Sequence, residues 1–197
     1  ATTADLLDII EGPDFPTGGI VTNKDELLSI YETGRGKIRI RGKAEIVRGK
    51  RKSDRDKIVI TEIPYTMVGA NIGKFLSDVA ALAESRKLPD IVDISNQSSK
   101  EGIRIEIELK KGADAERILA GLYKKTKLED TFGVNMLAIA DGRPETLNLK
   151  GILRNFMEFQ YQNTEHKYNV LLEKELDKKE IQEGLIAACD CIDLIIA

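Results

Sequence analysis

Five cationic side chains alternate with small and apolar residues in the segment GRGKIRIRGK, residues 34–43. They are Arg35, Lys37, Arg39, Arg41 and Lys43. Because successive side chains of a β-strand point to opposite faces, this spacing predicts one cationic face with charges about 6 to 7 Å apart. Like charges so arranged repel each other unless an anion lies over them. The phosphates of duplex DNA have a comparable spacing, so the pattern favours polyanion binding over a plain solvated face.

The positive charge continues beyond this strand and is local. Residues 35–57 contain eleven Lys and Arg against three Asp and Glu, a net charge of +8. Because the whole chain has a net charge of −3, the remainder carries −11. The further cations that we assign to the candidate DNA-binding face are Arg48, Lys50 and Arg51. One concentrated basic patch on a mildly acidic protein indicates a directed contact with a polyanion.

The residue types in this patch predict contacts with the phosphate backbone. The segment contains no Asn or Gln that could read base edges, and no aromatic residue on which a base could stack. Binding should therefore not depend on base sequence. It should weaken with salt by about 0.9 log units per log unit of salt for each phosphate neutralised.

Motifs for catalysis are absent from the sequence. It contains no P-loop, GxGxxG, HExxH or GxSxG motif. The glycines of residues 34–42 suggest a phosphate loop at first sight, but the alternation favours a strand. His166 is the only histidine, which excludes a multi-histidine metal site. We therefore expect no catalytic residue and no metal ligand in this chain.

Two pairs of residues are given structural roles. Cys189 and Cys191 are one residue apart in a stretch that reads as helix, so they face different sides and predict reduced thiols in a packed helix of a cytosolic protein. Glu106 and Glu108 alternate with isoleucine and are expected on a solvated strand face. Neither pair indicates a site.

Hydrophobic periodicity predicts an α+β fold. Strands are expected at 34–43, 57–64, 90–95, 103–109 and 134–140, and helices at 2–11, 25–33, 70–86 and 114–126. We expect 34–43 and 57–64 to pair as a long hairpin with a charged tip. From 57 onward the order is β-α-β-β-α-β, the two-layer split βαβ arrangement with both helices on one face of an antiparallel sheet.

The last part of the chain reads as long helix. From Leu149 onward there is no proline. The residues that predict an imperfect coiled-coil seam at heptad spacing are Ile152, Phe156, Phe159, Asn163, His166, Val170 and Lys174. No apolar run approaches the ~20 residues that span a bilayer, and the first residues do not resemble a signal peptide, so the expected location is cytoplasmic.

Four segments, in this order, resemble the A subunit of bacterial DNA gyrase and topoisomerase IV. They are GPDFPTGG, YETGRGKIRIRGKAEI, IVITEIPY and FGVNMLAIADGRPETLNLK. The resemblance covers nearly the whole chain and is firmest from Gly12 to Lys150. The tail segment NFMEFQYQNTEHKY departs from the more basic sequence usual in gyrase, so the choice between gyrase and topoisomerase IV stays open.

This resemblance implies a domain organisation and an activity. Residues 1–20 would end a winged-helix region, 21–148 would form the tower domain, and 149–197 would begin the long helices that lead to the C-gate. Members of the family are ATP-dependent type IIA topoisomerases, which cut one duplex through paired tyrosines and pass another through it. The basic face from Arg35 to Lys43 would support the arms of the cut duplex.

The resemblance also implies what this chain lacks and which partners it has. The family's catalytic tyrosine stands in an RYT context upstream of GPDFPTGG, so this chain alone should not cleave DNA. Magnesium and ATP would act through the B subunit, with no cofactor in this chain. The implied partners are duplex DNA, the B subunit, and a second copy of the parent chain in an A2B2 assembly, with no membrane.

Two other interpretations remain. The chain could be a rigid spacer between the DNA gate and the C-gate, its basic face balanced by acids of the B subunit. An RNA-recognition fold has the same β-α-β-β-α-β order, but it requires exposed aromatic residues on the central strands, and IRIEIEL has none.

Overall fold

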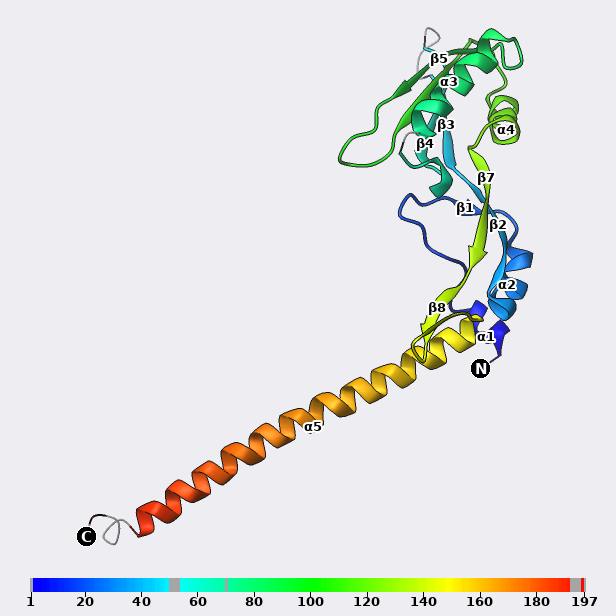
Figure 1. The fold of residues 1–197 in the computed structure, drawn as a ribbon. Coiled ribbons are helices and arrows are strands. Elements are labelled where there is room, and N and C mark those ends of the chain that lie inside the picture. The colour runs from blue at the N-terminus through cyan, green and yellow to red at the C-terminus, as the bar shows by residue number, and fades with distance from the viewer. Residues whose placement is uncertain (1, 50–53, 70, 192–195, 197) are drawn as a thin grey trace.

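The computed structural model describes residues 2–49, 54–69, 71–191 and 196, which form an elongated molecule (Figure 1). A body rich in β-structure lies at one end, and one long helix projects away from it (Figure 1). The α-helices are α1 (Thr3–Leu7), α2 (Leu27–Thr33), α3 (Asn71–Glu84), α4 (Ala115–Lys125) and α5 (Leu149–Asp190). Two short 3-10 helices are η1 (Lys24–Glu26) and η2 (Tyr65–Met67).

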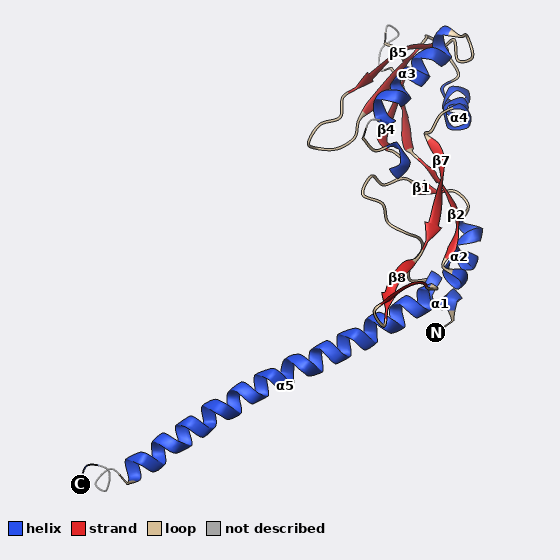
Figure 2. Ribbon diagram, in the orientation of Figure 1, coloured by secondary structure: helices blue, strands red, loops and turns tan. Residues whose placement is uncertain are grey.

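The strands of the described residues form three antiparallel sheets (Figure 2). The strands are β1 (Ile20–Val21), β2 (Arg35–Arg41), β3 (Lys43–Val47), β4 (Lys57–Glu62), β5 (Ile91–Asn96), β6 (Ile105–Leu109), β7 (Glu129–Asn135), β8 (Leu137–Ala140) and β9 (Arg143–Thr146). The sheet orders are β1-β2-β7, β3-β4-β6-β5 and β8-β9.

The four-stranded sheet contains only part of the predicted split βαβ arrangement. It holds β4, β5 and β6 in the expected order, but the strand after α4, β7, pairs with β2 in another sheet, and β3 lies at the edge beside β4. Strand β6 lies between β4 and β5, which are joined through α3. The inward residues of β4 and β6 share one hydrophobic core with Phe75 and Val79 of α3 and with Ile118 and Leu122 of α4. Both helices therefore cover the same face of the sheet. The predicted α+β class is confirmed.

The segment predicted as one strand, 34–43, is divided between two sheets. Strand β2 pairs with β7, from Arg35 opposite Asn135 to Arg41 opposite Glu129, and β3 pairs with β4. The hairpin with 57–64 is therefore made by β3, and the prediction that the cationic strand pairs with 57–64 is wrong for β2. The strand expected at 134–140 is also divided, because β7 pairs with β2 and β8 pairs with β9.

Gly42 is the point at which the chain passes from one sheet to the other. It is buried, its amide donates to the carbonyl of Leu128 at 2.8 Å, and its carbonyl accepts from the Tyr123 hydroxyl at 3.0 Å. A Cβ here would lie 2.7 Å from Leu128 Cδ1 and 2.8 Å from the carbonyl oxygen of Glu62. Close approach of three segments thus requires glycine.

A second core lies under the three-stranded sheet. Leu27, Ile30 and Tyr31 of α2 pack against Ile38 and Ile40 of β2. Helix α2 ends at Gly34, whose φ of 73° is left-handed and whose amide donates to the Ile30 carbonyl at 2.8 Å. This tight turn places β2 directly after α2, so α2 packs against the inner face of β2.

Helix α5 runs for 42 residues away from this body (Figure 1). The side chain of Asn148 caps it by accepting from the Gly151 amide at 2.7 Å. Cys189 and Cys191 are free, but both are exposed, so the prediction of a packed environment for them is wrong in this structure. Among the described residues, no helix has the length and apolar character needed to cross a membrane.

Candidate nucleic-acid interface

Strand β2 presents four of the predicted DNA-binding residues on its solvent face. They are Arg35, Lys37, Arg39 and Arg41. Ile38 and Ile40 point the other way and are 0% and 1% exposed. The predicted assignment of the two faces is therefore confirmed. Because the cations face solvent, they remain charged without a desolvation cost.

Strand β7 forms the other half of this surface and adds little bulk to it. The β7 residues opposite Arg35, Lys37, Arg39 and Arg41 are, in that order, Asn135, Gly133, Thr131 and Glu129. A Cβ at Gly133 would meet no atom within 4 Å, so the position beside Lys37 is open. Glu129 is the one acid that β7 contributes to this row of paired residues, and it lies at the end nearest Gly42.

Arg41 is held by two side chains of the body. Its Nε donates to Glu129 Oε2 at 2.5 Å, and its guanidinium carbon lies 4.5 Å from the centre of the Tyr123 ring. Burial raises the pKa of Tyr123 above its ordinary value, so the hydroxyl stays protonated and donates to the Gly42 carbonyl. Arg41 therefore contributes to the junction between the two sheets.

The other cations of β2 are less constrained. Arg39 Nε lies 4.0 Å from Glu129 Oε1, and its side chain remains 59% exposed. Arg35 is exposed and donates to the Thr146 hydroxyl at 3.2 Å. Lys37 is exposed, and its amine has no hydrogen-bond or ion-pair partner within the described part of the chain. These three side chains form a cationic row that is open to solvent.

Lys43 does not belong to that row, so the prediction of five cations on one strand face is wrong at this position. It begins β3, and its Nζ lies 3.5 Å from Glu62 Oε1. The other oxygen of Glu62 accepts from the Gly19 amide at 2.6 Å, which ties the loop before β1 to the same carboxylate. Of the remaining predicted residues, Arg48 is exposed just after β3, and Lys50 and Arg51 lie outside the described residues.

Asn23 is a structural part of the site that the sequence pattern did not indicate. Its side-chain oxygen accepts from the Arg39 amide at 2.7 Å, and its side-chain nitrogen donates to the Lys37 carbonyl at 3.0 Å. The amide group thereby continues the short edge strand β1 along β2. Its distance in sequence from both partners leaves no local signal for this role.

Glu106 corrects the prediction of a solvated acidic strand. It is only 6% exposed and accepts from Arg104 at 2.7 Å and from Lys57 at 3.1 Å. Hydrogen bonds from Arg104, and then from Lys57, lower the pKa of Glu106. Glu108 remains partly exposed and accepts from Lys57 at 3.0 Å, which contributes most to the raised pKa of Lys57. This face of the sheet is thus neutralised internally.

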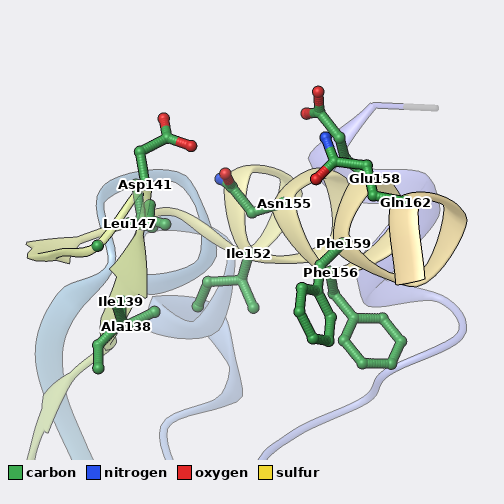
Figure 3. Close-up of a pocket in the computed structure, with 12 residues that line it drawn as sticks. Ala138, Ile139, Asp141, Leu147, Ile152, Asn155, Phe156, Glu158, Phe159 and Gln162 are labelled. Carbon is green, nitrogen blue, oxygen red and sulfur yellow. The ribbon is translucent and has the colours of Figure 1, made fainter. Parts of the chain in front are cut away.

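A cavity of about 570 Å³ lies between the β8–β9 ribbon and the first turns of α5 (Figure 3). Ile152, Phe156 and Phe159, three of the predicted seam residues, point to the same side of α5, while Asn155 and Glu158 point to the opposite side (Figure 3). The cavity is mostly apolar where these rings meet the ribbon. It brings together no nucleophile and base of the kind that catalysis requires.

The described residues also lack a cluster of three or more His, Cys, Asp or Glu side chains that could hold a metal ion. What the described part of the chain offers is an α+β body with an open row of cations and a long projecting helix.

Comparison with known proteins places this architecture in a family. The family model for the A subunit of DNA gyrase/topoisomerase IV matches residues 1–197, and the chain belongs to that family. It is 44% identical over 197 residues to the DNA gyrase A subunit of Clostridium acetobutylicum, covering 100% of this chain and 23% of that protein.

Two further relatives agree. The DNA gyrase A subunit of Staphylococcus epidermidis is 40% identical over 196 residues, 99% of this chain and 21% of that protein. The probable chloroplastic/mitochondrial DNA gyrase A subunit of Oryza sativa subsp. japonica is 39% identical over 196 residues, 100% of this chain and 21% of that protein. The chain thus spans less than a quarter of the length of each of these relatives.

Proposed function

We propose that this chain is part of the A subunit of an ATP-dependent type IIA DNA topoisomerase, where it holds the arms of the gate duplex by their phosphates. Family membership supports the assignment to an A subunit. The observation that carries the binding role is the open row formed by Arg35, Lys37 and Arg39, beside which β7 places only Asn135, Gly133 and Thr131. A cationic row without base-reading groups suits backbone contacts.

The row has dimensions suited to one DNA strand. Arg35 and Arg39 are separated by four residues of strand, about 13 Å, whereas the phosphates of one DNA strand rise about 3.4 Å each along the helix axis. Several phosphates therefore lie within reach of the three side chains. Bending a duplex costs a few kcal/mol, and contacts away from the cut can offset that cost.

The domain assignment and the partners belong to the same proposal. Residues 1–20 end a winged-helix region, 21–148 form the tower domain, and 149–197 begin the helices toward the C-gate. This chain alone should not cleave DNA, because none of its tyrosines stands in the RYT context of the family's catalytic tyrosine. Magnesium and ATP act through the B subunit, and the assembly is a cytoplasmic A2B2 complex.

A rigid spacer is the second candidate, and two observations favour it. Arg41 is already paired with Glu129, and Lys57 and Arg104 are already paired with Glu106. A molecule that neutralises its own charges in this way needs no anionic partner at those positions. The spacer interpretation predicts that removing the positive charges of β2 does not change DNA binding.

Duplex binding across salt concentrations separates the two candidates. We expect fluorescence anisotropy with chain 1–197 and a mixed-sequence duplex to give a slope of about −2.7 for log affinity against log salt, corresponding to three neutralised phosphates. The triple variant R35Q/K37Q/R39Q should abolish the slope. The matched control K178Q/K179Q changes cations of α5 that are paired with Glu175 and Glu183, and should preserve it. If the affinity of the unmodified chain does not depend on salt, the spacer interpretation is the one that remains.

A further inference from the structure

The four cations of β2 are equivalent in the sequence but not in the structure. Arg41 donates to Glu129 at 2.5 Å and lies over the ring of Tyr123, whereas the amine of Lys37 has no such partner within the described residues. A guanidinium whose Nε donates to a carboxylate and whose face lies over an aromatic ring is held in place by both contacts. Moving to a phosphate elsewhere along the row would break them.

Glu129 is placed to act on the binding row as well. Its side chain is only 17% exposed, and its second oxygen lies 4.0 Å from Arg39 Nε. A carboxylate at that position repels a phosphate brought to the Gly42 end of the row. The next acid, Asp130, is opposite Ile40 and therefore on the other face of β7.

We propose that Glu129 closes the phosphate-binding row at its Gly42 end, holding Arg41 as a positioning residue of the sheet junction and leaving Arg35, Lys37 and Arg39 as the phosphate ligands. This inference rests on the proposed function and assigns its ligands. The ligand is the backbone of one DNA strand, contacted over the length from Arg35 to Arg39. Lys43, paired with Glu62 in the other sheet, is likewise outside the row.

Single neutral variants test this division through the salt slope. One phosphate contact contributes about 0.9 to the slope, so K37Q should make the slope shallower by about 0.9. When salt is lowered from 1 M to 0.1 M, the rise in affinity of K37Q should then be about eightfold smaller than that of the unmodified chain. R41Q should leave the slope unchanged while lowering the unfolding temperature. A merely electrostatic role for both residues would change the two slopes equally.

The variant E129Q gives a second readout that does not depend on the stability of R41Q. Releasing Arg41 should steepen the slope by about 0.9 and tighten binding about eightfold at 0.1 M salt. The control D130N removes the same charge from the other face of β7 and should leave the slope unchanged. Circular dichroism of each variant verifies the fold.

The outcomes separate this inference from the proposed function. If the unmodified chain shows no salt-dependent binding, the proposed function fails. If it binds, but R41Q loses as much slope as K37Q, or E129Q has the slope of D130N, only the division of the row is overturned. The division is supported if the salt slope becomes shallower in K37Q, stays unchanged in R41Q and becomes steeper in E129Q.

Discussion

Replacing Gly42 with alanine tests the junction that sets the direction of the cationic row. The added Cβ would lie 2.7 Å from Leu128 Cδ1 and 2.8 Å from the carbonyl oxygen of Glu62. Carbon atoms prefer separations of about 3.5 to 4.0 Å, so neither contact is tolerated without movement. Leu128 is fully buried, and the Glu62 carbonyl belongs to the backbone of β4. Relief therefore requires a shift of packed structure.

We expect G42A to lower the free energy of unfolding by about 1 to 3 kcal/mol, the usual cost of overpacking a core. For a chain of this size each kcal/mol lowers the unfolding temperature by about 2 to 4 °C, so the expected decrease is about 2 to 12 °C. Thermal unfolding followed by circular dichroism measures it.

The matched control is G133A, on the adjacent strand β7. A Cβ there meets no atom within 4 Å, so the expected change is within about 0.5 kcal/mol. If G42A and G133A unfold at the same temperature, the close passage of the chain between the two sheets does not exist in solution. The explanation of why β2 and β3 separate at this residue would then be refuted.

Two further predictions concern the cores and a buried ion pair. I38A should destabilise the chain by about 2 to 5 kcal/mol in urea unfolding, because Ile38 is 0% exposed, whereas V47A on an exposed position should be nearly neutral. Because the pKa of Glu106 is lowered in the folded chain, the unfolded chain binds a proton at this carboxylate more readily than the folded chain does. The ionised Glu106 therefore stabilises the fold above the ordinary pKa of 4.5, and this stabilisation is lost as pH falls through the lowered pKa. E106Q should therefore be less stable than the unmodified chain at pH 7, and the difference should shrink in acid; a difference that grows in acid would contradict the sign.

The periodicity of β2 was sufficient to predict which side of the strand is buried. Alternation reports the two faces of a strand whatever its partner is, and Ile38 and Ile40 are buried accordingly. It does not report the partner. Strand β7 lies far along the chain, and Gly42 continues the alternation while the hydrogen bonding changes from one sheet to the other. The division into two sheets is therefore a tertiary effect.

The same limit applies to the charges. In the sequence Arg39 and Arg41 occupy equivalent positions, and only the register with β7 brings Glu129 against one of them at 2.5 Å. The alternation also placed Glu106 on the outer face of its sheet. The long side chains of Arg104 and Lys57 donate to the two oxygens of this buried carboxylate. Exposure of a polar residue depends on such neighbours.

The salt dependence of duplex binding by chain 1–197 tests the central claim most directly. If Arg35, Lys37 and Arg39 hold phosphates, log affinity should fall against log salt with a slope of about −2.7, and duplexes of different base sequence should give the same slope. A slope indistinguishable from zero would contradict the account and leave β2 as the outer face of a rigid spacer.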